Sequence, residues 1–296
     1  YNEPIKFSLI NDVELIIKRE DKLHEHISGN KYRKLKYNLI AAKKENQNTL
    51  LTFGGAYSNH IVATAAAGAE FGFKTIGIIR GDELAYKIEE NPTLKFANAS
   101  GMQLKFITRQ LYRNKKDKGF IDLLHNQFGN FYMLPEGGTN NLAIKGCEEI
   151  LTGNDTQFDY VCVAVGTGGT IAGLINSVKQ HQKVLGFPAL AGDFLNDDIK
   201  NLISSNNKWE LLHDYHFGGY GKINNTLVTF INQFTKETRI PLDPIYTGKM
   251  LYGIVDLINK GYFKKGSKIL AIHTGGLQGI KGMNIKLQQK GHPIIN

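Results

Sequence analysis

A loop of three glycines and two threonines, Gly166-Thr167-Gly168-Gly169-Thr170, separates an apolar run at 160–165 from a helical pattern that begins near Ile171. Several backbone N–H groups and a helix N-terminus would converge there, which predicts an anion-binding site. The spacing matches neither a dinucleotide loop, because position 171 is Ile, nor a P-loop. A single phosphate on a small ligand fits best, and a glycine-rich turn without a ligand is the alternative.

Lys31 occupies an unusual place in the segment Ser28-Gly29-Asn30-Lys31. Gly29 and Asn30 indicate a turn, so Lys31 would lie at the start of the amphipathic helix that follows. A cation at a helix N-terminus is unfavourable by about 0.3 to 1 kcal/mol unless the amine is neutral or bonded. A Schiff base with an aldehyde cofactor would explain this placement. A solvent-exposed, basic helix face is the alternative.

A second polar segment, Gly54-Gly55-Ala56-Tyr57-Ser58-Asn59-His60, precedes an alanine-rich stretch. Ser58 and Asn59 are both good N-cap residues, so capping alone would explain one of them. The free helix N-terminus, together with the side chains of Ser58, Asn59 and His60, would also form a cradle for a carboxylate. Both interpretations stay open from local chemistry.

Six motifs in one order resemble the pyridoxal-phosphate (PLP) family that contains 1-aminocyclopropane-1-carboxylate (ACC) deaminase and D-cysteine desulfhydrase. The resemblance runs from about residue 20 to the C-terminus, and it implies a tryptophan-synthase-β-like fold with the cofactor between a larger and a smaller domain. The motifs are Ser28-Gly29-Asn30-Lys31, Gly54-Gly55 with Ser58-Asn59-His60, Leu134-Pro135-Glu136-Gly137-Gly138-Thr139, Gly166-Thr167-Gly168-Gly169-Thr170, Asp243-Pro244-Ile245-Tyr246-Thr247-Gly248-Lys249 and His273-Thr274-Gly275-Gly276.

The resemblance also implies roles for individual residues. Lys31 would carry the cofactor aldehyde, Asn59 would contact its phenolic oxygen, and Ser58 would face the substrate carboxylate as a nucleophile or proton shuttle. Tyr246 matches an active-site tyrosine, and Tyr220 matches a second one in a less distinctive segment. The implied catalytic residues are Lys31, Ser58, Tyr220 and Tyr246; the substrate-binding residues are Ser58, Asn59 and His60; the cofactor-binding residues are Lys31, Asn59, Gly166, Thr167, Gly168, Gly169, Thr170, Thr247 and Thr274.

Two positions bear on the reaction. ACC deaminases of this family tend to have Gln and Glu at positions 60 and 247. This chain has His60 and Thr247, and desulfhydrases tend to have the same two residue types. A carboxylate keeps the pyridine nitrogen of PLP protonated, whereas the hydroxyl of Thr247 or Thr274 only shares a hydrogen bond with it. The weaker electron sink favours β-elimination from D-cysteine to pyruvate, sulfide and ammonia. ACC deamination to 2-oxobutanoate and ammonia is the alternative, and a PLP-binding regulatory homologue is the non-enzymatic one.

Alternating strand and helix patterns would position these segments. β-Branched runs recur at 49–53, 75–79, 103–107, 160–165, 184–187 and 268–273, with helical patterns between them at 59–70, 144–151, 171–179, 227–234, 251–260 and 277–289. The pattern predicts an α/β fold of open, twisted, parallel sheets with helices on both faces. Ligands of such sheets bind at the carboxyl ends of the strands, where the glycine clusters fall.

No linker marks a domain boundary. We expect a larger PLP-binding domain at 1–33 and 142–296 and a smaller inserted α/β domain at 34–141, because the insertion holds several complete βα units.

Composition narrows the setting. The formal net charge is +9, yet the basic residues are dispersed, so nucleic-acid binding is not expected. Two cysteines build neither a disulfide framework nor a four-thiolate zinc site, and no metal is expected. Without an apolar run of about 20 residues or a signal-peptide pattern, we expect no membrane association and a cytoplasmic location. The partners expected are a small amino-acid substrate and, by resemblance, a second copy in a homodimer.

Overall fold

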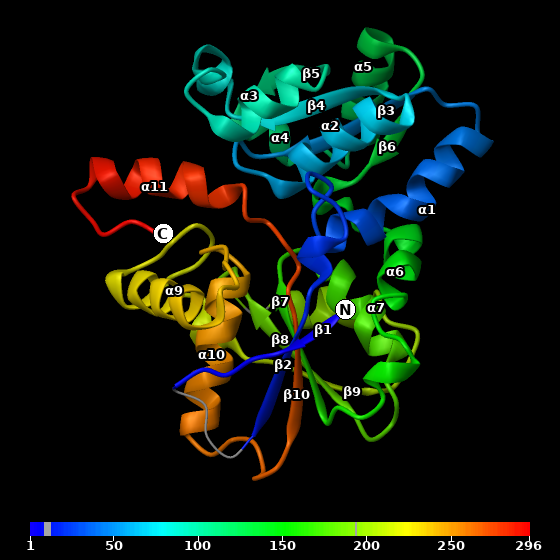
Figure 1. The fold of residues 1–296 in the computed structure, drawn as a ribbon. Helices are drawn as coiled ribbons and strands as arrows, with labels where there is room; N and C mark the ends of the chain where they lie inside the picture. The colour runs from blue at the N-terminus through cyan, green and yellow to red at the C-terminus, as the bar shows by residue number, and fades with distance from the viewer. Residues whose placement is uncertain (9–12, 193) are drawn as a thin grey trace.

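The computed structural model describes residues 1–8, 13–192 and 194–296. Two sheets, each covered by helices, form the upper and lower parts of the molecule in Figure 1. The strands of the smaller sheet all lie between residues 49 and 134, and the strands of the larger sheet precede and follow them in the sequence. The chain therefore leaves the larger unit, completes the smaller one and returns.

The larger sheet has six strands in the order β1-β2-β10-β7-β8-β9. All neighbours pair in parallel except β1 and β2, which pair antiparallel. The pairing of β7 with β8 aligns Tyr160 with Lys183 and Val165 with Pro188. The strands are β1 (Asn2–Pro4), β2 (Glu14–Lys18), β7 (Tyr160–Val165), β8 (Lys183–Pro188), β9 (Lys208–Leu211) and β10 (Lys268–Ile272).

The smaller sheet is parallel throughout, in the order β5-β4-β3-β6. Its central strands are nearly continuous apolar runs, as expected of strands that helices cover on both faces. The strands are β3 (Thr49–Gly54), β4 (Lys74–Arg80), β5 (Met102–Ile107) and β6 (Tyr132–Leu134).

Helices cover both faces of each sheet. One core lies between the larger sheet and helices α9 and α10, and a second lies on the other face under α7 and α8. The helices are α1 (Asn30–Lys44), α2 (Asn59–Phe71), α3 (Pro92–Ala99), α4 (Arg109–Arg113), α5 (Lys118–Phe128), α6 (Asn141–Glu148), α7 (Gly169–Ser177), α8 (Leu195–Lys200), α9 (Asn225–Thr238), α10 (Thr247–Asn259) and α11 (Gly279–Gln289).

Local chemistry explains where the functional helices begin and end. Ser58 caps α2 by accepting from the N–H of Ile61, and Gly72 ends the helix in the left-handed conformation at φ 76°. The alanine-rich body of α2 is buried on nearly all sides, which small side chains permit. The helix therefore starts at the polar segment and runs back through the core.

The parallel α/β architecture with helices on both faces is confirmed. The six strands and the main helices fall where the patterns placed them. Several elements escaped prediction, among them the short β1, β2, β6, β9 and α3 and the longer helix α5. The domain boundaries stay a prediction, and the one at 33/34 falls inside α1, which is a continuous helix.

Helices α1 and α6 approach so closely that glycine is required at position 146. A Cβ atom there would lie 2.0 Å from the carbonyl oxygen of Arg33. Because that obstacle is helix backbone, it cannot turn aside as a flexible side chain would. Gly146 thus fixes α6 against the helix that carries Lys31.

We predict that Gly146→Ala lowers the free energy of unfolding by about 1 to 3 kcal/mol, because overpacking outweighs the better helix propensity of alanine. Gly119→Ala is the matched control, since Gly119 also lies in a helix and a Cβ there meets nothing within 4 Å. The control should stabilise slightly. Urea unfolding midpoints of both variants test this, and equal shifts would contradict the packing argument.

Candidate functional site

The predicted site residues gather where the carboxyl ends of the two parallel sheets face each other. Two hydrogen bonds join segments from opposite sides. The amide of Gln278, after β10, donates to Oδ1 of Asn59, after β3, over 2.7 Å, and the hydroxyls of Thr139 and Thr167 lie 2.6 Å apart. Loops that follow strands of both sheets therefore build one site, as expected of open α/β sheets.

Lys31 lies in the first turn of α1 and directs its amine toward the site. Its Nζ atom is 3.1 Å from the carbonyl oxygen of Gly137, and Nζ of Lys34 is 3.0 Å from the same oxygen. Burial, together with the positive charge of Lys34, holds the pKa of the Lys31 amine well below its usual range. The lowered pKa increases the share of the unprotonated, nucleophilic amine that attack on an aldehyde requires.

The glycine loop connects β7 to α7 and is held from three directions. Lys34 donates to Oγ1 of Thr139 over 2.9 Å and to Oγ1 of Thr167 over 3.4 Å. The amide of Asn30 donates to Oγ1 of Thr170 over 2.8 Å. A Cβ atom at Gly169 would lie 3.2 Å from Nζ of Lys34. The predicted anion site thus combines a helix N-terminus with a buried cation.

The Ser58 segment follows β3 on the opposite side. Ser58 Oγ caps α2 by accepting from the N–H of Ile61 over 3.4 Å, and Asn59 contacts Gln278 as described. His60 is 1% exposed, and within the described chain neither ring nitrogen has a hydrogen-bond partner. Burial, followed by the charges of Lys31 and Lys34, lowers the pKa of His60 well below its usual range. An unpaired buried imidazole is costly, which points to a polar ligand beside it.

Two tyrosines from the larger unit face this region. The rings of Tyr220 and Tyr246 meet edge to face with centroids 6.2 Å apart. A Cβ atom at Gly166 would lie 3.3 Å from the Tyr246 ring, so Tyr246 lies over the glycine loop. Burial raises the pKa of Tyr246 well above its usual range and also raises that of Tyr220, so both hydroxyls stay protonated.

Thr247 is engaged by Asp243 at the start of α10. Its hydroxyl donates to Oδ1 of Asp243 over 2.8 Å and accepts from the N–H of Asp243 over 3.0 Å. A hydroxyl has one proton, so in this arrangement Thr247 has none left to donate to a ring nitrogen. Thr274 follows β10 and is 8% exposed.

A phosphorylated aldehyde cofactor fits these residues. Lys31 offers an amine of lowered pKa, and the Gly166–Thr170 loop with Lys34 offers an anion site on the same side. The unpaired nitrogens of buried His60 provide polar atoms that a ligand between the two sheets would satisfy. The site therefore has a group for the aldehyde and a group for the phosphate of such a molecule.

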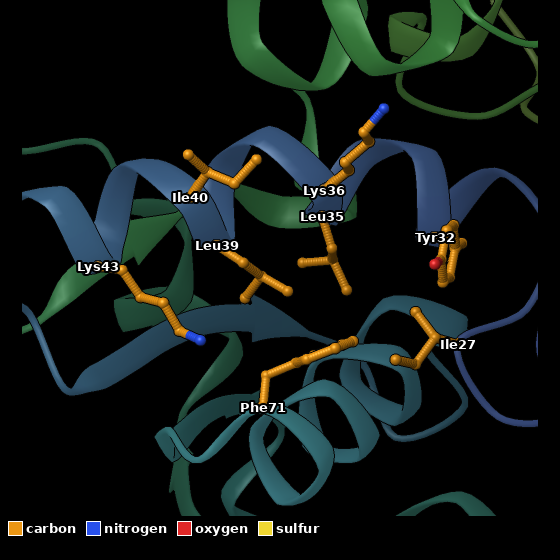
Figure 2. Close-up of a pocket in the computed structure, with 8 residues that line it drawn as sticks. All are labelled: Ile27, Tyr32, Leu35, Lys36, Leu39, Ile40, Lys43 and Phe71. Atoms are coloured by element: carbon orange, nitrogen blue, oxygen red, sulfur yellow. The ribbon is translucent and has the colours of Figure 1, made fainter.

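Figure 2 shows a different pocket, of about 230 Å³, between α1 and α2. Its lining is mainly aliphatic and aromatic, with the stems of Lys36 and Lys43 at its edge. The lining residues are Ile27, Tyr32, Leu35, Lys36, Leu39, Ile40, Lys43 and Phe71. None of the predicted site residues is among them, so we place the chemistry at the facing strand ends.

The sequence profile described as "Pyridoxal-phosphate dependent enzyme" matches residues 5–275 of the chain. The chain belongs to this family. Its cofactor is PLP, and the predicted resemblance is confirmed. A putative ACC deaminase of Pyrococcus horikoshii is 32% identical, over 90% of this chain and 85% of that protein. The mitochondrial bifunctional D-cysteine desulfhydrase/ACC deaminase of Arabidopsis thaliana is 32% identical, over 92% of this chain and 74% of that protein.

Solved structures agree with the fold. A crystal structure described as an ACC deaminase homologue superposes with a TM-score of 0.82 at 27% identity, covering 98% of this chain and 93% of the other. The structure of an O-ureido-L-serine synthase, at 14% identity and a TM-score of 0.70 over 94% and 89% of the two chains, shares the fold alone. The predicted two-unit PLP enzyme architecture is thus confirmed, and the chain is an enzyme of the lyase and deaminase group. Among the described residues, no helix has the length and apolar character to cross a membrane.

Sequence reasoning missed Lys34, Asp243 and Gln278. Lys34 lies one helical turn after Lys31, so the i, i+3 spacing would have placed both amines on one face of α1. Asp243 is part of the Asp-Pro motif, yet no local pattern indicated that its carboxylate would accept a hydrogen bond from the Thr247 hydroxyl. Gln278 meets Asn59 only through the tertiary fold.

We predict that Lys34→Met raises the pKa of Lys31, because a neighbouring positive charge that disfavours the protonated amine is removed. The pH at which half of Lys31 becomes a free amine should therefore move upward. The measurement is the initial rate of Schiff-base formation between cofactor-free protein and pyridoxal, which lacks the phosphate, from roughly pH 6 to 10.

Lys36→Met serves as the control for that experiment, because Lys36 is exposed on the same helix and pairs with Glu149 at 2.6 Å. Its midpoint should match the unmodified protein. A midpoint for Lys34→Met that stays in place or moves downward would show that Lys34 does not set the state of Lys31.

Proposed function

We propose that the protein is a β-eliminating lyase that converts D-cysteine, or a closely similar small D-amino acid, to a 2-oxo acid, ammonia and, from cysteine, sulfide. The observation that carries the proposal is a threonine, Thr247, where ACC deaminases tend to have a glutamate, together with the protonated pair Tyr220 and Tyr246 beside the glycine loop. The name of the Arabidopsis relative includes the same activity.

PLP, when bound, supplies an electrophilic aldehyde and a conjugated ring that takes up negative charge from the substrate α-carbon. Lys31 would hold its aldehyde end. The loop from Gly166 to Thr170, with Lys34 behind it, would hold the phosphate end, and Asn59 would contact the phenolic oxygen. The Lys31 amine and the anion site support the first two positions, and the role of Asn59 is the one that the family resemblance implies.

Ser58, Asn59 and His60 would bind the substrate carboxylate at the N-terminus of α2, where backbone N–H groups favour an anion. Lys31 would take the α-proton if that proton faces its amine. For a D-amino acid, whose α-proton lies on the opposite face, Ser58 would take it instead. His60 is held neutral by burial, so it would donate or accept one hydrogen bond without adding charge.

Tyr246 and Tyr220 would orient the β-substituent and donate hydrogen bonds to it as it leaves. Both hydroxyls keep their protons over the physiological pH range because burial raises their pKa values. A departing thiolate needs a hydrogen-bond donor and little further assistance, because an ordinary thiol has a pKa near 8.5. The tyrosine pair therefore suits expulsion of a sulfur group.

The ring nitrogen would meet a hydroxyl and no carboxylate. The Thr247 hydroxyl already donates its hydrogen bond to Asp243, so it could only accept a hydrogen bond from the ring nitrogen. We therefore propose Thr274 for this contact. A hydroxyl leaves the ring a weaker electron sink than a carboxylate does. Opening an unactivated cyclopropane needs the stronger sink, so ACC deamination is the second candidate, supported by the names of several relatives.

We also propose a cytoplasmic homodimer. The two cysteines are buried and unpaired, and burial raises the pKa of both thiols, that of Cys147 to about 11. Inert thiols of this kind suit a reducing compartment.

Light scattering on the purified protein measures the oligomeric state, and a monomeric mass at micromolar concentration would refute the dimer.

We predict that D-cysteine, among D-cysteine, L-cysteine and ACC, gives the highest kcat/KM, because the proposed site matches a D-configured substrate and a weak electron sink. Sulfide, ammonia and 2-oxo acid are measured separately for each compound. Production of 2-oxobutanoate from ACC at a higher kcat/KM would establish the second candidate instead.

We predict that Lys31→Ala abolishes covalent attachment of PLP, because Lys31 is the lysine of the Ser-Gly-Asn-Lys motif, whereas the nearby Lys34 amine is engaged by Thr139 and Thr167. Borohydride reduction followed by peptide mass spectrometry locates the attachment. Lys34→Ala is the matched control and should keep the label at residue 31 while binding PLP more weakly. A label that persists elsewhere in Lys31→Ala would overturn the assignment of Lys31.

A further inference from the structure

Lys249, on α10, is buried deeply for a lysine and is not used by the proposed reaction. It is 2% exposed, and its Nζ atom lies 2.9 Å from the carbonyl oxygen of His216 and 3.0 Å from that of Gly219. Both acceptors belong to the segment 216–221, which carries Tyr220. A single amine thus joins the start of α10 to the Tyr220 segment.

Burying this ammonium is costly. Burial lowers the pKa of Lys249 to about 8, and the negative charge of Asp243 opposes that shift only in part. A methionine would fill similar space without the desolvation penalty. The cost must therefore be offset by the two carbonyl contacts, which are charge-assisted and stronger than neutral hydrogen bonds.

The Tyr220 segment needs such an anchor because it is rich in glycine and Phe217 adopts the left-handed conformation that a non-glycine residue disfavours. Phe217, Gly218, Gly219 and Gly221 all have positive φ, at 54°, 89°, 111° and 69°. Tyr220 is 44% exposed, and the ring contact that holds it on its inner side is the one with Tyr246. A segment of this kind opens easily unless hydrogen bonds from a rigid element fix it.

The α10 helix is that rigid element, and it also carries the second tyrosine. Lys249 follows Tyr246 by three residues, about one helical turn. The Tyr220 and Tyr246 rings meet at 6.2 Å with an interplanar angle of 65°. The first turn of α10 therefore positions Tyr246 directly. It also holds the Tyr220 segment through the hydrogen bonds of the Lys249 amine.

We propose that Lys249 is a positioning residue that holds Tyr220 against Tyr246, so that the two hydroxyls act as a pair. The importance of the pair for turnover rests on the proposed function; the anchoring itself does not. Lys249 touches neither substrate nor cofactor in this proposal and acts only through Tyr220.

Hydrogen exchange of the cofactor-free protein tests the anchoring without any activity. Amides of the segment 216–222 should exchange about tenfold faster in Lys249→Met than in the unmodified protein, because the two carbonyl anchors are lost. Lys260→Met is the matched control, since Lys260 ends the same helix and pairs with Asp256 at the surface. Unchanged exchange in 216–222, or equal acceleration throughout α10, would overturn the proposal.

A double-mutant cycle tests the effect on turnover. Lys249→Met and Tyr220→Phe should each lower kcat/KM, by about ten- to a hundredfold, and the double variant should lose no more than Tyr220→Phe alone. PLP content should stay equal in all variants. Multiplying losses would show that Lys249 acts independently of Tyr220 and would refute the proposal.

Lys249→Gln provides a second variant in case the methionine variant folds poorly. Its amide keeps two N–H donors for the carbonyls, so exchange in 216–222 and kcat/KM should both lie between Lys249→Met and the unmodified protein. A glutamine variant no better than the methionine variant would contradict anchoring through hydrogen bonds. If none of the amino acids is turned over, the proposed function fails, while hydrogen exchange still decides the role of Lys249.

Discussion

Two lysine amines share one backbone carbonyl where the two sheets meet. Lys31 and Lys34 come from α1, the carbonyl belongs to Gly137 after β6, and Lys34 reaches on to Thr167 after β7. Positive charges placed this close disfavour each other, and the charge of Lys34 adds to burial in lowering the pKa of Lys31. The same contacts that join the sheets therefore favour the nucleophilic, unprotonated form of Lys31.

The reactive side chains are otherwise set at the starts of helices. Ser58 begins α2 and Tyr246 begins α10, and each is fixed by capping hydrogen bonds that are local in sequence. Asp243 accepts hydrogen bonds from the N–H groups of Ile245, Tyr246 and Thr247. The same carboxylate also accepts the hydrogen bond of the Thr247 hydroxyl. Capping thus determines both the position of the tyrosine and the limited chemistry of its neighbour.

Much of the fold followed from periodicity, because the central strands and the long helices carry strong apolar patterns. Strands β6 and β9 escaped because three or four residues are too few to show a period, and β2 because it lies in an N-terminal stretch without a clear alternation. Among site residues, Lys31, Ser58 and the glycine loop were recognisable from motifs. Lys34 was hidden in a basic run that looked solvent-exposed, although it is 2% exposed.

The sequence by itself determined which segments do the chemistry, since helix starts, glycine loops and capping residues act over a few residues. It also carried the motifs that identify the PLP family. Only the tertiary structure decided which groups are charged, which are paired and which are free. Burial and neighbouring charges lower the pKa values of Lys31 and His60, and Asp243 accepts the hydrogen bond of the Thr247 hydroxyl. These states depend on desolvation and on contacts between residues far apart in the chain, which no local pattern contains.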